Sequence, residues 1–539
     1  MKKFKESKIG IILLMTLLVI QFTYMIFWGT QKSGYYVDEF FTYDNTHYIS
    51  ASTPDRVKLY DADYMEYDKW FDVLEIKNTL MVQKEEALLQ DTLTEQMRAF
   101  LNKPYMAILN YVEAIFFEGE LNWWSSISIN VVCFVLNQVL IYLIVMKISK
   151  NRSAALTSMA LYGFCGMAVS MFVYVRMYMW LTFLTSLFTY LHALMWAEEK
   201  HWKNIVYEIF SMLVLFLAYN NSPLPVLYGA ALIGCFSIGL IVRKKWVQTA
   251  YYSVPLILGG TLFAVFKTHY IDTFKNPQAA LESGKLGAAE GSLVEAFVTL
   301  NGEEFVRRLE NFMHMVCRFL FGHSIIVLIY LALVIAILIV MIKNKESIKG
   351  QINSDGKAFG LVMVSAIILY ALASIAFDLS AIRYNSFVFP VIAVCAVITV
   401  FHMAQIVKKE KWIVIIGTVM ILGEIFFTAS IPRIENLYLE DRTGVEAIRQ
   451  YKGIDSLVVD YHFDDKVMYE CLAYTDENTK VMFTAYGSTD YSKLGDNLLV
   501  WQTVNEEDKV VADLLNAGYM DIHEIANTHE SRVFLCKKQ

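Results

Sequence analysis

The strongest constraint on this chain is a series of long apolar runs. A helix that crosses a membrane needs about 20 mostly apolar residues, because the hydrocarbon core is about 30 Å thick. Of the 539 residues, 56% are hydrophobic and 18% are charged, against about 25% charged in an average soluble chain. The sequence therefore predicts a polytopic α-helical membrane protein with about eleven transmembrane helices. The runs lie near 9–28, 126–147, 154–174, 178–196, 204–219, 223–242, 250–266, 324–343, 359–377, 385–405 and 412–430.

The basic residues between these runs predict the orientation, because Lys and Arg are enriched in cytoplasmic loops. The clusters MKKFKESK, KISKNR, EEKHWK, VRKKW, KNKESIKG and VKKEK all fall on the side of the N-terminus. The short turns on the other side hold only Arg176 and Arg383. We therefore expect the N-terminus in the cytoplasm, and an odd number of spans places the C-terminus outside. The first run is too long for a signal peptide and is expected to be an uncleaved anchor.

Three larger segments face outward in this topology, at 30–125, 267–323 and 431–539. The first includes KNTLMVQKEEALLQDTLTEQMRAFL, whose apolar spacing of three and four predicts amphipathic helices along the membrane interface. The last alternates strand-like runs (SLVVDYHF, KVMFTAY, NLLVWQTV, RVFLC) with helical stretches (GVEAIRQY, KVMYECLAY, KVVADLLNAGY), which is typical of a small α/β domain. We therefore expect a transmembrane domain over 1–430, including the two outer loops, and an extracytoplasmic α/β domain over 431–539. Neither a G-x-G-x-x-G motif nor a nucleic-acid footprint is present.

The first outer segment holds an adjacent pair of carboxylates, Asp38 and Glu39. A carboxylate partly removed from water can act as a general base on an acceptor hydroxyl, while its neighbour orients a substrate or a metal. Asp44 and His47 follow at a spacing that could add ligands for a divalent metal, although one His and scattered carboxylates are a weak signal. The alternative is a solvated acidic pair in a loop. The flanking aromatic residues could hold the pair near the lipid headgroups; they are Tyr35, Tyr36, Phe40, Phe41 and Tyr43.

Two arginines lie at the outer ends of apolar runs, where cations are normally rare. Arg176 is in VYVRMYMW and Arg383 is in SAIRYNSFVFP. The guanidinium fork matches phosphate oxygens, and a neighbouring aromatic ring can pack on a lipid or a sugar. The alternative for each is an interfacial arginine that reaches to headgroups.

The loop at 267–323 carries more basic residues, most of which are expected to be ordinary loop and interface charges. His314 and Arg318 are four residues apart, so on a helix they would share a face and could help to hold an anion. The full set is Lys267, His269, Arg307, Arg308, His314, Arg318 and His323.

Taken together, these motifs resemble those of the GT-C membrane glycosyltransferases, particularly the bacterial branch similar to protein O-mannosyltransferases and aminoarabinose transferases. Those families carry an acidic pair in the first extracytoplasmic loop, an Arg-Met-Tyr motif, and a late Arg-Tyr followed by a proline. In this chain the motifs correspond to Asp38 with Glu39, Arg176 with Met177 and Tyr178, and Arg383 with Tyr384 and Pro390.

The chain departs from the family pattern at two places. It reads NKPYMAIL where relatives often have HPP before the second span, which weakens any inherited metal or donor contact in that loop. It has Tyr174 where relatives often have an acidic residue two positions before the arginine, which leaves Arg176 without that carboxylate partner.

The resemblance implies an inverting transfer of a sugar from a polyprenyl-phosphate-linked donor to an extracytoplasmic acceptor, which could be a cell-envelope glycan, a lipid or a protein. It implies a location in the bacterial plasma membrane and no nucleic-acid partner. Asp38 would be the base beside Glu39, and a divalent metal is left open. The residues expected to bind the donor phosphate and lipid are Arg176, Tyr178, Arg383, Tyr384 and Arg318.

Two other classes of function remain open at this stage. A transporter would also have many spans, but transporters often show internal repeats and ionisable groups deep in the bundle. No repeat is visible here, and the notable charges lie near one membrane surface. A non-catalytic scaffold or sensor, whose C-terminal domain binds a wall polymer or a protein, is the third alternative.

Overall fold

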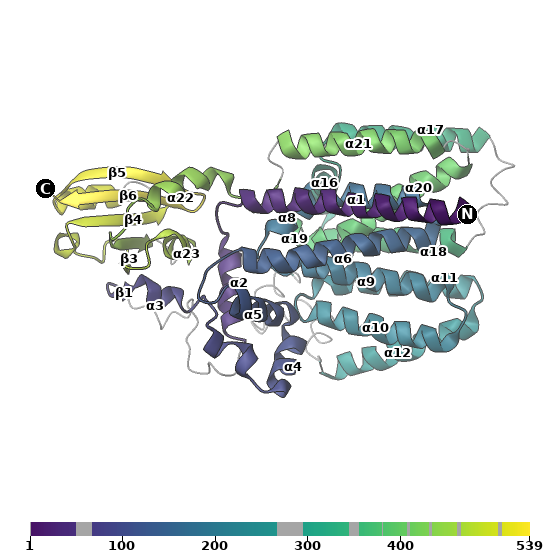
Figure 1. Ribbon diagram of the computed structural model, residues 1–539, viewed down its shortest axis with the longest axis horizontal. Coiled ribbons are helices and arrows are strands. Elements are labelled where there is room, and N and C mark those ends of the chain that lie inside the picture. The colour runs from purple at the N-terminus through teal and green to yellow at the C-terminus, as the bar shows by residue number, and fades with distance from the viewer. Residues whose placement is uncertain are drawn as a thin grey trace. The chain divides into compact units, whose positions relative to one another are not determined.

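The computed structural model describes residues 2–49, 67–266, 295–343, 355–379, 381–406, 410–430, 434–460, 465–504 and 509–538 (Figure 1). The chain divides into two compact units. The helical unit comprises Met1–Ile26, Asn130–Phe172 and Tyr178–Ile434, and the sheet unit comprises Phe27–Ile129, Val173–Met177 and Glu435–Gln539. This division differs from the predicted boundary at residue 430, because the first outer segment groups with the C-terminal residues.

Every apolar run identified in the sequence coincides with helix. The run at 154–174 is split into two helices, α7 and α8, bent by 54°. In Figure 1, α9, α10 and α12 run side by side. The helices are α1 (Lys2–Gln31), α6 (Trp124–Ser149), α7 (Arg152–Gly163), α8 (Gly166–Val173), α9 (Tyr178–Ala197), α10 (His201–Tyr219), α11 (Leu224–Val242), α12 (Trp246–Phe266), α16 (Gly302–Leu320), α17 (Ser324–Lys343), α18 (Asp355–Ala376), α19 (Ile382–Asn385), α20 (Phe389–Ile406) and α21 (Glu410–Ser430).

Length and composition give a lower count of spans than the sequence predicted. Among the described residues, six helices are long and apolar enough to cross a membrane. The number rises to eight if the bent pairs α7–α8 and α16–α17 are each one span, and Val414–Thr428 is a shorter apolar helix. The bend of 96° between α16 and α17 lies at Gly322, whose φ of +69° favours glycine. The count of about eleven spans therefore stays a prediction.

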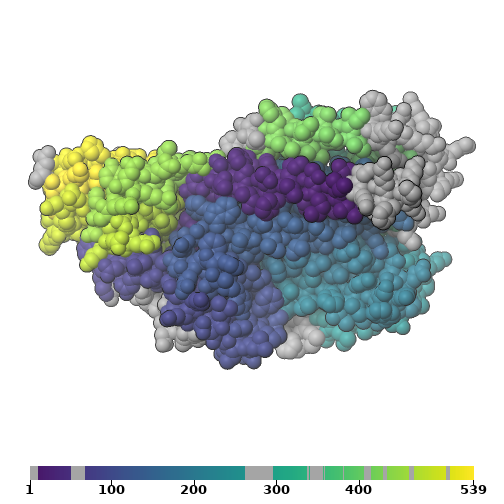
Figure 2. Space-filling view, in the orientation of Figure 1, coloured from purple at the N-terminus to yellow at the C-terminus, as the bar shows by residue number. Residues whose placement is uncertain are grey.

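The outward faces of these helices are apolar. Ile12 is 62% exposed, Val242 is 74% exposed and Ile257 is 65% exposed. Figure 2 shows the side chains of the teal helices α10 to α12 at the surface of the molecule. Many exposed, large apolar side chains on long apolar helices are expected where helices face lipid. The helical unit is therefore built as a membrane domain.

The C-terminal residues contain strands and helices, and their assignment as a separate α/β domain stays a prediction. Six strands lie in the order β1-β3-β2-β4-β6-β5. Strand β2 pairs in parallel with β3 and β4, and the other neighbours are antiparallel. The yellow strands and the adjacent helices are visible in Figure 1. The elements are β1 (Trp70–Asp72), β2 (Ser456–Asp460), β3 (Lys480–Ala485), β4 (Asn497–Thr503), β5 (Tyr519–Asn527), β6 (Ser531–Lys538), α22 (Arg442–Ile448), α23 (Asp465–Tyr474) and α24 (Lys509–Asn516).

Both faces of the sheet are covered, because successive strand residues point to opposite sides. On one face, Val458 and Trp501 pack with Tyr469 of α23. On the other, Val459 packs with Leu514 of α24. Burial on both faces explains why the central strands read as continuous apolar runs.

The first outer segment forms short helices that join this unit. Strand β1 comes from this segment and pairs with β3. The segment predicted to form amphipathic helices contains two 3-10 turns at residues 84–90 ahead of α4, and its location at the membrane interface stays a prediction. Thr92 and Glu95 form a capping box at the start of α4, and Pro104 begins α5. The helices are α2 (Val37–His47), α3 (Val73–Lys77), α4 (Leu93–Asn102) and α5 (Pro104–Phe116).

Candidate active site

Glu39 lies at the centre of a buried network of hydrogen bonds. Its Oε2 accepts from the main-chain N–H of Tyr36 at 2.8 Å, which caps the start of α2. Its Oε1 accepts from the N–H of Val175 at 2.7 Å. The ammonium of Lys32 donates to both carboxylate oxygens, at 3.0 and 3.1 Å. Glu39 is therefore fully engaged in holding two chain segments together.

Lys32 is as deeply buried as its partner, since both side chains are 0% exposed. Burial lowers the pKa of the Lys32 ammonium, and the charge of Glu39 opposes that shift. A third hydrogen bond runs from Lys32 Nζ to the carbonyl of Asn436 at 2.9 Å. A buried charge survives only with a partner and with its other donors satisfied, and this lysine has both. Lys32 thus ties the acidic pair to the segment that precedes the α/β fold.

Asp38 has a different environment from that of its neighbour. Its side chain is half-buried, and its Oδ2 accepts a hydrogen bond from the Tyr174 hydroxyl at 3.1 Å. Arg176 Nη1 donates to the main-chain carbonyl of Asp38 at 2.6 Å and to the Thr42 hydroxyl at 3.3 Å. The second motif therefore contacts the first directly. Tyr174, which stands where relatives often have an acidic residue, meets the catalytic candidate as a neutral donor.

These contacts depend on a break between α8 and α9. Val173 ends α8 and Tyr178 begins α9, so the four residues between them are not helical. Such a break leaves main-chain groups without helical partners. The N–H of Val175 finds Glu39, and the N–H of Arg176 bonds to the carbonyl of Tyr174 at 2.8 Å.

The aromatic residues beside the pair are largely core residues of the sheet unit. Phe40 is 1% exposed, and its ring stacks on Tyr469 of α23 at 4.9 Å between centroids. Tyr35 is 4% exposed and Tyr43 is 1% exposed. We expected these rings near lipid headgroups. Instead they anchor α2 to the α/β fold, because both lie in one continuous apolar core.

The third motif lies in the helical unit, as do Tyr178 and Arg318. The guanidinium of Arg383 lies over the ring of Tyr384, 5.3 Å from its centroid. Both residues lie in the short helix α19. Asn385 at its end fixes this helix, because its side chain forms hydrogen bonds with Tyr370, Ser374 and the carbonyl of Leu379. That Arg383 lies close to Asp38 stays a prediction. Tyr178 is buried at the start of α9, and Arg318 lies over the ring of Phe319 in α16.

The other basic residues of the second outer loop have ordinary contacts. Arg308 is buried and bonds to main-chain carbonyls at the end of α18, and Arg307 pairs with Glu304 at 2.7 Å. His314 is exposed on α16. The expected anion site of His314 with Arg318 stays a prediction. Lys267 and His269 lie outside the described residues.

Within the described residues, Asp44 and His47 are not part of a group of three or more potential metal ligands. Both are buried, at 0% and 2% exposure. The group of three potential ligands in the described part of the chain consists of Asp441, Glu470 and His529 instead. A divalent metal beside the acidic pair therefore stays an untested expectation.

Two residues of this site were missed at the level of sequence. Lys32 follows the first apolar run and looks like an ordinary flanking charge. Its partners Glu39 and Asn436 are 7 and 404 positions away. Tyr174 was noted only as the loss of a carboxylate.

No family model and no curated protein sequence matches the chain. Solved structures do match it along almost the whole length. The crystal structure of ArnT from Cupriavidus metallidurans bound to undecaprenyl phosphate has a TM-score of 0.54 and 12% identity, covering 97% of each chain. The same protein in its apo state has a TM-score of 0.52 and 12% identity, covering 98% of each chain. The chain therefore shares its fold with these ArnT structures.

Proposed function

We propose that this protein is a GT-C-type membrane glycosyltransferase that moves a sugar from a polyprenyl-phosphate-linked donor to an acceptor outside the membrane. Two independent lines support the proposal. The three motifs occur in the order expected for such enzymes. The chain also has the fold of ArnT, which was crystallised with undecaprenyl phosphate. The N-terminus is cytoplasmic in this proposal, and the α/β fold is extracytoplasmic.

In the proposed reaction Asp38 is the general base. Its carboxylate takes the proton of the acceptor hydroxyl, and the acceptor oxygen forms a bond to the anomeric carbon of the sugar. The bond from that carbon to the phosphate oxygen breaks, and polyprenyl phosphate leaves with the electron pair. Attack from the side opposite the leaving group inverts the anomeric centre.

The observation that carries this assignment is the unequal engagement of the two carboxylates. Glu39 is 0% exposed and accepts hydrogen bonds from Lys32, Tyr36 and Val175. Asp38 is half-buried and precedes Glu39 in the first turn of the same helix, so its side chain points about 100° away from that of Glu39. A base must reach its substrate, so Asp38 fits that role and Glu39 fits a positioning role.

The arginines supply the charge that such a leaving group needs. Arg383, beside Tyr384, is the proposed donor-phosphate ligand, with Tyr178 and Arg318 as further donor contacts. A planar guanidinium can form two parallel bonds with phosphate oxygens, where negative charge increases in the transition state. Arg176 is a further proposed donor contact. It also holds the main chain of Asp38 in place.

The deciding experiment compares the wild type with Asp38→Asn in membranes that are supplied with a panel of radiolabelled polyprenyl-phosphate sugars. We expect Asp38→Asn to insert normally and to lose transfer by a factor of about 100 or more, as is typical when a general base is removed. Asp72→Asn is the matched control, because Asp72 is an exposed aspartate of the same outer segment. Turnover that is equal in all three proteins would exclude Asp38 as the base. Absence of turnover of any donor would favour a transporter or a scaffold.

A further inference from the structure

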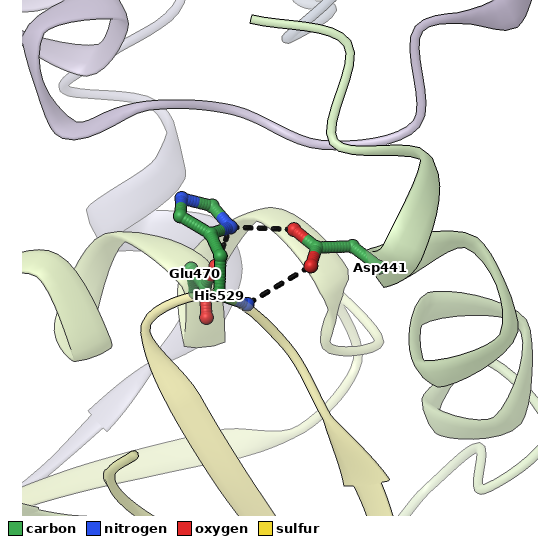
Figure 3. Close-up of side chains that lie close together, drawn as sticks. All are labelled: Asp441, Glu470 and His529. Carbon is green, nitrogen blue, oxygen red and sulfur yellow. Dashed lines mark hydrogen bonds and ion pairs between the residues drawn. The ribbon is translucent and has the colours of Figure 1, made fainter. Parts of the chain in front are cut away.

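Three side chains from separate elements converge in the sheet unit. Asp441 ends the 3-10 turn Leu439–Asp441, Glu470 lies in α23, and His529 lies in the turn between β5 and β6. One ligand atom of each lies within 4.8 Å of the other two. Figure 3 shows the imidazole with its Nδ1 toward both carboxylates.

One oxygen of each carboxylate is already fixed by the protein. Asp441 Oδ1 accepts from the main-chain N–H of His529 at 2.9 Å. Glu470 Oε2 accepts from the Thr528 hydroxyl at 2.5 Å. These bonds orient the other two oxygens toward the imidazole. Carboxylates that bind metals are commonly held in this way by a hydrogen bond to the other oxygen.

The cluster is not satisfied by its own hydrogen bonds. His529 Nδ1 is 2.5 Å from Asp441 Oδ2 and 3.2 Å from Glu470 Oε1. A single N–H can serve only one of these oxygens well, and the shorter contact is to Asp441. Glu470 is 1% exposed, and its Oε1 accepts no hydrogen bond. A buried carboxylate oxygen without a donor is costly, so its orientation into the cluster points to a cation.

The surrounding charges are mainly negative. Glu530 adds a third carboxylate, 3.7 Å from His529 Nε2. Lys466 pairs with the outer side of Glu530 at 3.6 Å and is 40% exposed. We propose that Asp441, Glu470 and His529 bind one divalent metal ion of the Zn²⁺ class, with water in the remaining positions. One imidazole nitrogen and two carboxylate oxygens are a donor set that Zn²⁺ accepts and that Mg²⁺ and Ca²⁺ rarely use.

The metal would support the segment that carries the acidic pair. Gly34 lies so close to the cluster that a Cβ there would be 2.8 Å from Asp441 Oδ2. The ring of Tyr438 stacks on His529 at 4.1 Å between centroids. Lys32 Nζ lies 5.5 Å from the centroid of that tyrosine ring. A metal that joins the 3-10 turn to α23 and to the hairpin would therefore fix the surroundings of Lys32.

The test uses the purified full-length protein in detergent, stripped with EDTA and titrated with Zn²⁺ against a chromophoric chelator. We expect the wild type to take up one equivalent and to gain several degrees in Tm, because the ion binds the folded state. His529→Gln and Glu470→Gln should lose this stoichiometric binding. His523→Gln is the matched control, because His523 pairs with Asp521 on an exposed part of the same unit and should bind like the wild type.

Wild-type protein that takes up no stoichiometric Zn²⁺ and has the same Tm with and without EDTA would overturn the proposal. Such a result would leave the cluster as a hydrogen-bonded imidazole and carboxylate pair. This comparison needs only the wild type, so it holds even if a variant fails to fold. The readout is independent of sugar transfer, and the Asp38→Asn protein should bind Zn²⁺ like the wild type.

Discussion

Removing the ammonium of Lys32 would leave the carboxylate of Glu39 buried without its counter-ion. The two side chains are 0% exposed and 3.0 Å apart. The informative set is Lys32→Met, which keeps an unbranched chain of similar size, Glu39→Gln, and the double variant. Each change acts on the network that joins α2 to Val175 and Asn436.

The magnitude follows from what each variant leaves unpaired. Losing one partner of a buried ion pair costs about 3–5 kcal/mol. In Lys32→Met, Glu39 keeps the hydrogen bonds from the N–H groups of Tyr36 and Val175. We therefore expect the free energy of unfolding to fall by about 3 kcal/mol, the low end of that range. In Glu39→Gln an amide N–H₂ group replaces one carboxylate oxygen and faces donors whose hydrogen bonds that oxygen had accepted. The expected loss in free energy of unfolding is therefore similar. The double variant has no buried charge at this site. We expect its loss in free energy of unfolding to be about 2 kcal/mol smaller than the sum of the losses in the two single variants.

Apparent Tm in detergent, followed by intrinsic fluorescence, is a suitable assay. About 2–4 °C per kcal/mol is expected for a unit of this size, so each single variant should lose about 6–12 °C. Lys203→Met is the control, because Lys203 forms a more exposed pair with Glu198 and such pairs contribute about 0–1 kcal/mol. If Lys32→Met melts within about 2 °C of that control, or if the double variant is strictly additive, the network does not hold the site as argued.

Two further predictions concern single groups of the sheet unit. Tyr174→Phe removes the donor to Asp38 and should slow transfer by about tenfold, the effect of one lost hydrogen bond, with apparent Tm nearly unchanged. Burial raises the pKa of Glu113 from 4.5 to about 8, and a hydrogen bond from Ser125 opposes this shift. Between these values the folded state binds more protons than the unfolded state, so stability should fall by about 1.4 kcal/mol per unit as pH rises through this window. Melting at several pH values should show this slope in the wild type and in the exposed control Glu118→Gln, but not in Glu113→Gln, and parallel curves for all three would contradict it.

The local elements were largely predictable, because each depends on a pattern within a short window. Apolar runs of about 20 residues predicted helices, and the central strands β2, β3, β4 and β6 were visible as apolar runs. Strands β1 and β5 were missed for physical reasons. Strand β1 has three residues and exists only through its pairing with β3, about 400 positions away in sequence. Strand β5 is an edge strand with many polar residues, which weakens its pattern.

The candidate site was predictable only in part. Residue types and motif order predicted that Asp38, Glu39, Arg176 and Arg383 share the outer face. The structure brings the acidic pair and Arg176 into contact, and the place of Arg383 in the site stays a prediction. The roles within the group depend on tertiary contacts. A lysine beside an apolar run usually reaches toward headgroups or water. Lys32 instead turns inward, because Glu39 and Asn436 offer it three acceptors in the core.

The geometry of a helix explains why two adjacent carboxylates take different roles. Successive residues of an α-helix differ by about 100° in direction, so Asp38 and Glu39 cannot face the same environment. The bonds from Lys32 and Val175 fix the direction of Glu39, and this sets the rotation of α2 about its axis. This rotation also sets the direction of Asp38, whose carboxylate accepts from Tyr174 and whose main-chain carbonyl accepts from Arg176. A substitution at Lys32 should therefore reduce transfer through the orientation of Asp38, although Lys32 itself touches no part of the proposed reaction.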